Sequence, residues 1–251
     1  MTAFPLDLDA PDTHLMVLTG AGISAESGLS TYRDQNGLWE HHPVKEVATP
    51  WGFEADPGRA WRFWSERRAE AQRVDPNAGH RALVEPENRL GERFLLVTQN
   101  VDGLHQRAGS RRVVELHGSL LRSRCATCKQ PAFADDALYL DGTIPPCDPP
   151  CRHDAPGLIR PDVVWFGEPI AQPDMDAVDR FMTRAAKGRF LFVAAGTSGT
   201  VTPASAFVEE AKKLGAESHV VNLEPAANAA YFDHQHLGRC GDLLPQLLAT
   251  P

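Results

Sequence analysis

Residues 18–28 read LTGAGISAESG, a glycine-rich turn that directly follows the apolar run 15–18. An apolar run leading into glycines predicts a strand, a tight turn and the start of a helix. Glycine lets the backbone approach a phosphate closely, and N–H groups at a helix start favour negative charge. Gly20-x-Gly22-x-x-Ala25 therefore fits the fingerprint of a dinucleotide-binding turn. The same pattern can also be mere packing, so the rest of the chain has to distinguish the two.

Apolar runs alternate with helical patterns along the chain. Strands are expected at residues 14–18, 93–98, 112–116, 189–195 and 218–223, and helices at 57–73, 78–90, 174–187, 203–214 and 241–249. Several of the strand runs are continuously apolar, as in parallel strands buried on both faces. This order predicts the α/β class, with a doubly wound, Rossmann-like parallel sheet. Residues 129–161 are rich in Pro, Asp and Cys, which indicates a small inserted module.

The composition indicates a globular protein. With 251 residues, 42% hydrophobic and 23% charged, the chain can bury a sizeable core. A net charge of −8 and a pI of about 5.7 argue against a nucleic-acid-binding protein. The first residues, MTAFPLDLDAPD, lack the features of a signal peptide, and no apolar run reaches the length of a membrane span. We therefore expect a cytoplasmic protein without nucleic-acid or membrane partners.

Four of the five cysteines lie in two close pairs, Cys125-x2-Cys128 and Cys147-x3-Cys151, separated by 18 residues. Thiolates at this spacing can close a tetrahedron around Zn²⁺, as in zinc ribbons. Because protein atoms would fill all four positions, the metal would be structural rather than catalytic. Free or disulfide-bonded cysteines are the alternative, which a chain without export signals disfavours. Cys240, the fifth, is expected to pack near the end of the last strand.

Polar side chains follow several of the predicted strands at the points where the strands end. The stretches are TQNVDGLHQR (98–107), AAGTSGT (194–200) and VNLEP (221–225), and His117 follows the strand at 112–116. Ligands of open α/β sheets bind outside the carboxyl ends of the strands, so these groups would line one binding edge. His117 is the candidate general base, because an imidazole titrates near neutrality. The other histidines considered are expected to be structural: His41, His42, His105, His234 and His236.

Together these motifs resemble the sirtuins, a family of NAD-dependent protein lysine deacylases. The matching stretches are GAGISAESGL with TYR and GLW, TQNVDGLHQRAG, ELHG, the cysteine pairs, RPDVVWFGE, GTSGTV and VNLEP, in family order over about residues 14–242. The resemblance, nearest to the bacterial class III desuccinylase-like branch, implies one catalytic unit over 1–251. It would contain a Rossmann-like NAD-binding domain (about 10–40, 75–118 and 162–251). A small domain would combine a helical insert (about 41–74) with a zinc-ribbon module (about 119–161).

The resemblance also implies roles for the matching residues. His117 would be the general base, and Asn100 would orient the ribose and a water. The residues implied in cofactor binding are Gly20, Ala21, Gly22, Ala25, Glu26, Thr31, Tyr32, Arg33, Trp39, Gln99, Asn100, Asp102, Gly196, Thr197, Ser198, Asn222, Leu223, Glu224 and the backbone of Cys240. Those implied in pairing with the peptide as an added strand are Val163, Val164, Phe166, Gly167 and Glu168.

The implied reaction consumes NAD. The acyl oxygen of a modified lysine attacks C1′ of the nicotinamide ribose, nicotinamide leaves and an alkylimidate forms. His117 then helps to deprotonate a ribose hydroxyl, so that the 2′ oxygen attacks the imidate carbon. The products would be free lysine and O-acyl-ADP-ribose. The implied partners are acylated lysines of proteins or peptides, with one structural Zn²⁺ and a monomeric enzyme.

The stretch WRFWSERR (61–68) bears on the acyl group. In the desuccinylase-like branch a Tyr-x-x-Arg pair binds the carboxylate of succinyl- or malonyl-lysine. Arg67 matches that arginine, whereas Trp64 stands where the tyrosine is expected, and Ala48 matches a small residue that leaves room for a long acyl chain. We expect removal of acetyl and also acidic acyl groups, the latter depending on Arg67. The alternative is that Arg67 and Arg68 form a solvated helix face and Trp64 is core.

Other functions remain open at this point. Within the family they are a deacetylase without acidic-acyl activity and a mono-ADP-ribosyltransferase. An NAD-dependent dehydrogenase would need an acidic residue at a strand end about 20 positions after the glycine turn, and no convincing strand precedes Glu40 or Glu46. A zinc-ribbon interaction module without enzymatic activity would leave the polar edge and His117 without a reason to converge.

Overall fold

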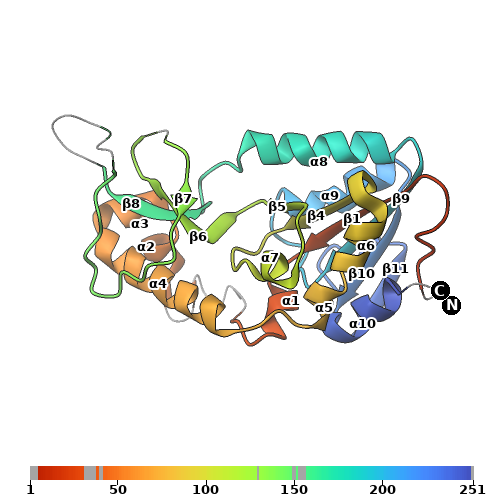
Figure 1. The fold of residues 1–251 in the computed structure, drawn as a ribbon, viewed down its shortest axis with the longest axis horizontal. Coiled ribbons are helices and arrows are strands. Elements are labelled where there is room, and N and C mark those ends of the chain that lie inside the picture. The colour runs from red at the N-terminus through yellow and green to blue at the C-terminus, as the bar shows by residue number, and fades with distance from the viewer. Residues whose placement is uncertain are drawn as a thin grey trace.

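A computed structural model of the chain describes residues 5–30, 38–39, 42–128, 130–148, 151 and 157–249. Figure 1 shows two parts: a larger one built on a parallel sheet with helices on both faces, and a smaller one of helices and short strands. The first and last described segments meet on the larger part, where the N–H of Leu6 donates to the carbonyl of Leu247 (2.8 Å). Among the helices of the described residues, none has the length and apolar character that crossing a membrane requires.

The larger part contains six parallel strands in the order β11-β10-β9-β1-β4-β5. Their bounds are β1 (Thr13–Thr19), β4 (Phe94–Thr98), β5 (Val113–Glu115), β9 (Arg189–Ala195), β10 (Glu217–Asn222) and β11 (His234–Leu237). From β1 the chain first builds outward to one side, through β4 and β5, and then returns to the other side at β9. The fold class is confirmed as a doubly wound parallel sheet, whose switch point lies beside the carboxyl end of β1.

The core lies on both faces of this sheet. Met16 and Leu18 of β1 pack with α8 (Gln172–Ala185) and α9 (Phe207–Lys213), whereas Leu15 and Val17 face the side of α6 (Val84–Leu90) and α10 (Cys240–Leu247). Every residue of β1 is buried, which explains its continuous apolar run. Short helices complete this part: α1 (Ala21–Ala25), α5 (Ala78–Arg81), α7 (Leu104–Ala108) and 3₁₀ turns at Gly91–Arg93, Ala204–Ala206 and Ala229–Tyr231.

The smaller part joins helices to an antiparallel sheet in the order β7-β6-β8. Its elements are α2 (Val44–Val47), α3 (Pro50–Ala55), α4 (Pro57–Arg73), β6 (Gly118–Cys125), β7 (Phe133–Ala134) and β8 (Ile159–Val163), next to the strand pair β2 (Leu38–Trp39) and β3 (His42–Pro43). The carboxylate of Asp56 accepts a hydrogen bond from the N–H of Arg59, and Pro57 occupies the first turn, so both signals start α4 where the sequence predicts it.

Arg68 on α4 is fully buried rather than solvated. Its guanidinium donates to the carbonyls of Leu120 (2.6 Å) and Ala137 (2.5 Å) and lies 3.2 Å from the carboxylate of Asp135. The interpretation of this helix face as solvated is therefore wrong for Arg68. A second difference concerns the helix expected at 78–90, which the structure divides into α5 and α6.

Candidate active site

The glycine turn packs directly on the carboxyl end of β9. The N–H of Gly20 donates to Ala195 (3.0 Å), and the N–H of Gly22 donates to Gly196 (2.8 Å). A Cβ on Gly20 would lie 2.7 Å from the carbonyl oxygen of Gly196, and one on Gly22 would lie 2.8 Å from its Cα. Both positions therefore require glycine, because any side chain would separate the ends of β1 and β9. Ala21 and Ala25 bound the short helix α1 that follows.

Ser24, inside this turn, is the centre of a buried hydrogen-bond network. Its hydroxyl donates to Asp102 (2.7 Å) and accepts from the amide of Asn100 (3.0 Å). Nδ1 of His80 accepts from the N–H of Asn77 at 3.3 Å, so Nε2 carries the proton that points to Ser24 at 3.4 Å. The amide of Asn100 also donates to the carbonyl of Gly20 at 3.1 Å. The network fixes Asn100 and Asp102, from the end of β4, against the glycine turn.

The charges in this network follow from burial. Burial raises the pKa of the Asp102 carboxyl, although hydrogen bonds from Leu104 and Ser24 oppose the shift. Burial is also the largest cause that lowers the pKa of His80 to about 4 and that of His105 to about 3. Nε2 of His105 lies 2.9 Å from the hydroxyl of Thr19. Both imidazoles are therefore neutral at pH 7.

His117 lies where the two parts of the molecule meet, between β5 and β6. Its Nδ1 is 2.9 Å from the carbonyl oxygen of Gln99, which can only accept, so Nδ1 carries the proton and Nε2 offers a lone pair. Burial lowers the pKa of His117, which keeps the ring neutral at pH 7. Gly118, the next residue, has φ +78°, and a Cβ there would meet the carbonyl of Asp162 at 2.0 Å. The backbone thus turns from one sheet into the other directly at the candidate base.

The ends of β9 and β10 form the other side of this edge. The side chain of Asn222 accepts from the N–H of Thr197 (3.0 Å) and donates to its carbonyl (2.7 Å). The amide of Gln99 donates to the hydroxyl of Thr197 (3.1 Å), which joins β4 to β9. Ser198, Leu223 and Glu224 are exposed beside them, Leu223 to 65%. The structure therefore brings the predicted residues of β1, β4, β9 and β10 to one edge of the sheet.

Glu26 binds the backbone at Cys240, so its carboxylate does not point into open space. One carboxylate oxygen of Glu26 accepts from the N–H of Cys240 (2.6 Å) and the other from the N–H of Gly241 (3.0 Å), at the start of α10. A carboxylate at a helix N-terminus is favourable. The thiol of Cys240 is buried next to the carbonyl of Val221, as the sequence suggested, and burial raises its pKa to about 12. A cofactor role for these two residues stays a prediction.

The segment predicted to pair with a peptide connects β8 to the large part. Val163 ends β8, and the N–H of Val164 donates to the carbonyl of His117 (2.9 Å). The N–H of Phe166 donates to Ala48 (3.0 Å), and Phe166 itself is 47% exposed. Gly167 has φ +90°. The carboxylate of Glu168 accepts from Arg160 (2.6 Å), Arg124 (3.4 Å) and the N–H of Trp165 (2.9 Å), so it holds the segment in place.

Trp64 and Ala48 lie together in the small core. Trp64 is 1% exposed, and its indole N–H donates to the carbonyl of Val47 at 2.7 Å, next to buried Ala48. This bond already uses the only donor of the indole. Arg67, one turn further along α4, lies over the ring of Phe63 and donates to Glu70 at 2.7 Å. Of the pair Trp64 and Arg67, the guanidinium is therefore the group able to bind an acyl carboxylate.

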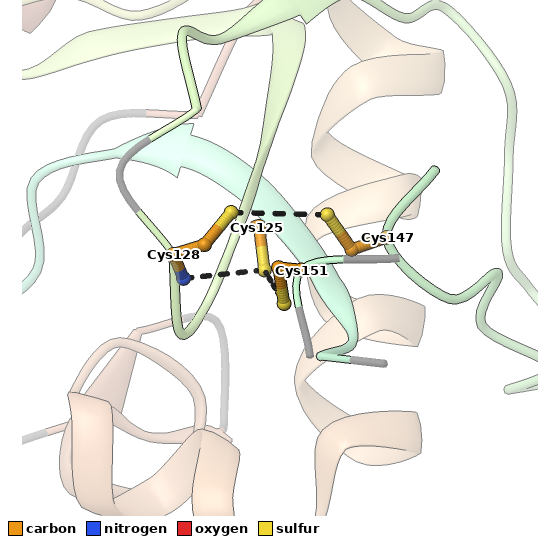
Figure 2. A group of neighbouring side chains, drawn as sticks. All are labelled: Cys125, Cys128, Cys147 and Cys151. Carbon is orange, nitrogen blue, oxygen red and sulfur yellow. Dashed lines mark hydrogen bonds between the residues drawn. The ribbon is translucent and has the colours of Figure 1, made fainter. Parts of the chain in front are cut away.

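Figure 2 shows the four clustered cysteines converging from the end of β6 and the loop before β8. Their sulfur atoms lie within 4.8 Å of one another, with Cys125 and Cys151 at 3.7 Å and Cys128 and Cys147 at 3.8 Å. Zn–S bonds of about 2.3 Å in a tetrahedron place neighbouring sulfurs about 3.8 Å apart. The four thiols thus fit one structural Zn²⁺, and no disulfide joins any of the five cysteines.

Some predicted residues lie outside this description, and some observed ones were not predicted. Thr31, Tyr32 and Arg33 fall outside the described residues, as does the side chain of Trp39. The sequence did not single out Ser24, His80 or Thr19, and it assigned His105 a structural role. Ser24 lies inside the quoted turn, which was the available signal. The rings of His80 and His105 are 4.8 Å apart, and their separation of 25 residues in the sequence does not predict this contact.

The fold and the site define a class of protein: a Rossmann-like α/β protein with a dinucleotide-type glycine turn and a four-cysteine module. Residues 20–203 match the Sir2 family. An NAD-dependent protein deacylase of Salmonella typhimurium is 44% identical over 93% of this chain and 82% of its own length. This chain therefore belongs to the Sir2 family.

Solved structures agree. The complex of a Sir2 homologue with NAD has a TM-score of 0.82 and 35% identity, over 94% of this chain and 88% of that one. A complex of Sir2 with a p53 peptide and NAD⁺ has a TM-score of 0.75 and 28% identity, over 92% and 90%.

Proposed function

We propose that this protein is an NAD-dependent protein lysine deacylase that releases nicotinamide, O-acyl-ADP-ribose and free lysine. The observation that carries the proposal is the junction at His117. A neutral imidazole stands between the sheet edge with the glycine turn and the β8 segment, the two sides from which cofactor and peptide would come. Membership of the Sir2 family and relatives that carry the name NAD-dependent protein deacylase support it.

The residues of the site would divide the work. NAD, when bound, supplies the ribose carbon at which the acyl oxygen is captured. The Ser24 network would hold Asn100 and Asp102 rigid at the nicotinamide end, so that little order is lost when the reactants meet. Nε2 of His117, with Nδ1 held by the carbonyl of Gln99, would accept the proton of a ribose hydroxyl after nicotinamide has left.

The test uses this order of steps. Purified protein is mixed with NAD and acetyl-lysine peptide, and the products are identified by mass spectrometry. His117→Ala is expected to lower deacylation by about 10²- to 10⁴-fold, the usual contribution of a general base. It should still exchange labelled nicotinamide into NAD, because the base acts after nicotinamide departs. Loss of both activities in a folded variant, or NADH formation by the wild type, would contradict the proposal.

We also propose that the enzyme removes acidic acyl groups, and that Arg67 binds their carboxylate. Arg67 lies about one turn along α4 from the buried Trp64, and its side chain is 11% exposed. Glu70 already accepts from it at 2.7 Å, so an acyl carboxylate would have to displace or share this partner. We therefore expect measurable activity on succinyl-lysine and malonyl-lysine, weaker than a tyrosine-assisted pocket would give.

The values of kcat/KM on succinyl- and acetyl-lysine peptides test this proposal. Arg67→Met should reduce the succinyl value at least about tenfold, the loss of one charge-assisted hydrogen bond, and leave the acetyl value nearly unchanged. Arg62→Met, on the exposed face of the same helix, is the matched control. Equal losses on both peptides, or no succinyl activity in the wild type, would leave a deacetylase without a carboxylate site.

A further inference from the structure

A second group of possible metal ligands lies far from the cysteines, at the edge formed by β10 and β11. Glu217 and His219 come from β10 and His234 from β11, and their ligand atoms lie within 4.8 Å of one another. His219 pairs with His234 in the sheet register. Because alternate residues of a strand share a face, all three side chains project to the same side. They lie at the amino ends of their strands, whereas the candidate active site lies at the carboxyl ends.

The distances suit a metal better than a set of direct hydrogen bonds. Oε1 of Glu217 lies 3.4 Å from Nε2 of His219 and 3.4 Å from Nε2 of His234. Ligand bonds of about 2.1 Å in a tetrahedron place neighbouring ligand atoms about 3.4 Å apart. Nε2 of His219 is buried, and within the described part of the chain it has no well-formed hydrogen bond beyond its 3.4 Å contact with Glu217. When Nε2 carries no proton, its lone pair and the carboxylate of Glu217 repel each other, and a bound cation removes that repulsion.

The surrounding residues hold the ligands in a binding orientation. Nδ1 of His219 lies 3.1 Å from Nε2 of His236, and the two rings are stacked nearly parallel. If Nδ1 carries the proton, Nε2 is the atom left for a metal, and this second contact fixes the ring. Arg189 lies 3.5 Å from the other oxygen of Glu217, which leaves Oε1 directed at the imidazoles. Since the side chains of Glu217 and His234 are 42% and 33% exposed, an ion can enter from solvent.

We propose that Glu217, His219 and His234 bind one divalent first-row transition metal, such as Zn²⁺ or Co²⁺, with a water in the remaining position. A set of two imidazoles and one carboxylate binds these ions in preference to Mg²⁺ or Ca²⁺, which favour oxygen ligands. The ion joins β11, a four-residue edge strand, to β10. It therefore stabilises the edge of the sheet at the end opposite to Asn222. The sequence suggested a structural role for His234, and the proposal makes it a ligand of a structural metal.

The experiment is a titration of Co²⁺ into the zinc-loaded protein, followed by calorimetry and visible absorption. The wild type should bind one Co²⁺ per chain without the strong charge-transfer absorption of thiolate ligands. Glu217→Gln and His234→Gln should weaken binding at least about tenfold, and His236→Gln by a smaller factor. Glu210→Gln, exposed on α9, should not change it.

Melting temperatures provide the second readout. Co²⁺ should raise the melting temperature of the wild type and not that of Glu217→Gln or His234→Gln, because only a bound ion shifts the folding equilibrium. Melting without added metal checks that each variant is folded. The proposal is overturned if the wild type takes up no Co²⁺. It is also overturned if both ligand variants bind Co²⁺ as tightly as the wild type does. Thiolate absorption on Co²⁺ binding overturns it too, since it assigns the ion to the cysteines.

Discussion

His80 links the site network to pH. Burial of this ring, which is 0% exposed, lowers its pKa to about 4, whereas an unfolded chain has a histidine pKa of about 6.5. A lowered pKa means that the stabilisation is complete above pH 6.5 and is lost as the pH falls toward 4. Between pH 7 and pH 5 the unfolded ring takes up a proton and the folded ring stays mostly neutral. The linkage then removes about 2 kcal/mol from the free energy of unfolding.

The assay is urea unfolding at pH 7, 6 and 5. His80→Asn should lower stability at pH 7, but its loss between pH 7 and pH 5 should be about 2 kcal/mol smaller than that of the wild type. Ser24→Ala is the matched control: it removes the hydroxyl near His80 but leaves the ring, so the pH dependence of the wild type should remain. The reasoning is refuted if His80→Asn and the wild type lose equal stability over this range. It is refuted equally if Ser24→Ala removes the dependence as fully.

Three further outcomes are expected. Arg68→Met should lower the free energy of unfolding by about 3–5 kcal/mol in urea, because Asp135 stays buried without its cation, whereas the exposed Arg62→Met should change it by less than about 0.5 kcal/mol. A chelator should lower the melting temperature of the wild type, and Cys128→Ser should melt near the chelated value without responding to the chelator. Asp102→Asn should reduce deacylation but not lower the free energy of unfolding at pH 7, because burial raises the pKa of Asp102 and its ionised form is penalised there; a drop above about 2 kcal/mol would contradict this.

The parallel sheet could be predicted because its central strands are buried on both faces. β9 was expected at 189–195 and has those bounds. A continuous apolar run between predicted helices is typical of a parallel strand that is buried on both faces, as β9 is. The bounds of α4 were expected from the helical spacing of its apolar residues, and Asp56 and Pro57 begin the helix there. The antiparallel sheet escaped prediction because β6 reads GSLLRSRC and pairs with a strand over thirty residues away. Arg122 and Arg124 of β6 bind carboxylates that lie far away in the sequence, and the alternation of residues along the strand does not predict these pairs.

The candidate site was predictable in its location but not in its internal order. Gly20, Asn100, Thr197 and Asn222 lie at or within two residues after the ends of parallel strands of one sheet, so their meeting at one edge follows from the topology. The bond from Ser24 to Asp102 depends instead on side-chain angles fixed by packing. For the same reason the sequence could place Trp64 at a candidate acyl pocket, but only the structure shows that its indole N–H donates to the carbonyl of Val47.

The turn at His117 and Gly118 has a consequence for redesign of this protein. Two residues, Leu116 and His117, separate β5 of the large sheet from β6 of the smaller part, which also contains Ala48, Trp64 and Arg67. Residues 44–73 contribute no strand to the large sheet, and they meet it mainly through Val101 and through the bond from Arg107 to Ala71. If the proposed roles of Ala48, Trp64 and Arg67 hold, a library confined to α2, α3 and α4 should change the acyl group that is removed and leave the release of nicotinamide unchanged.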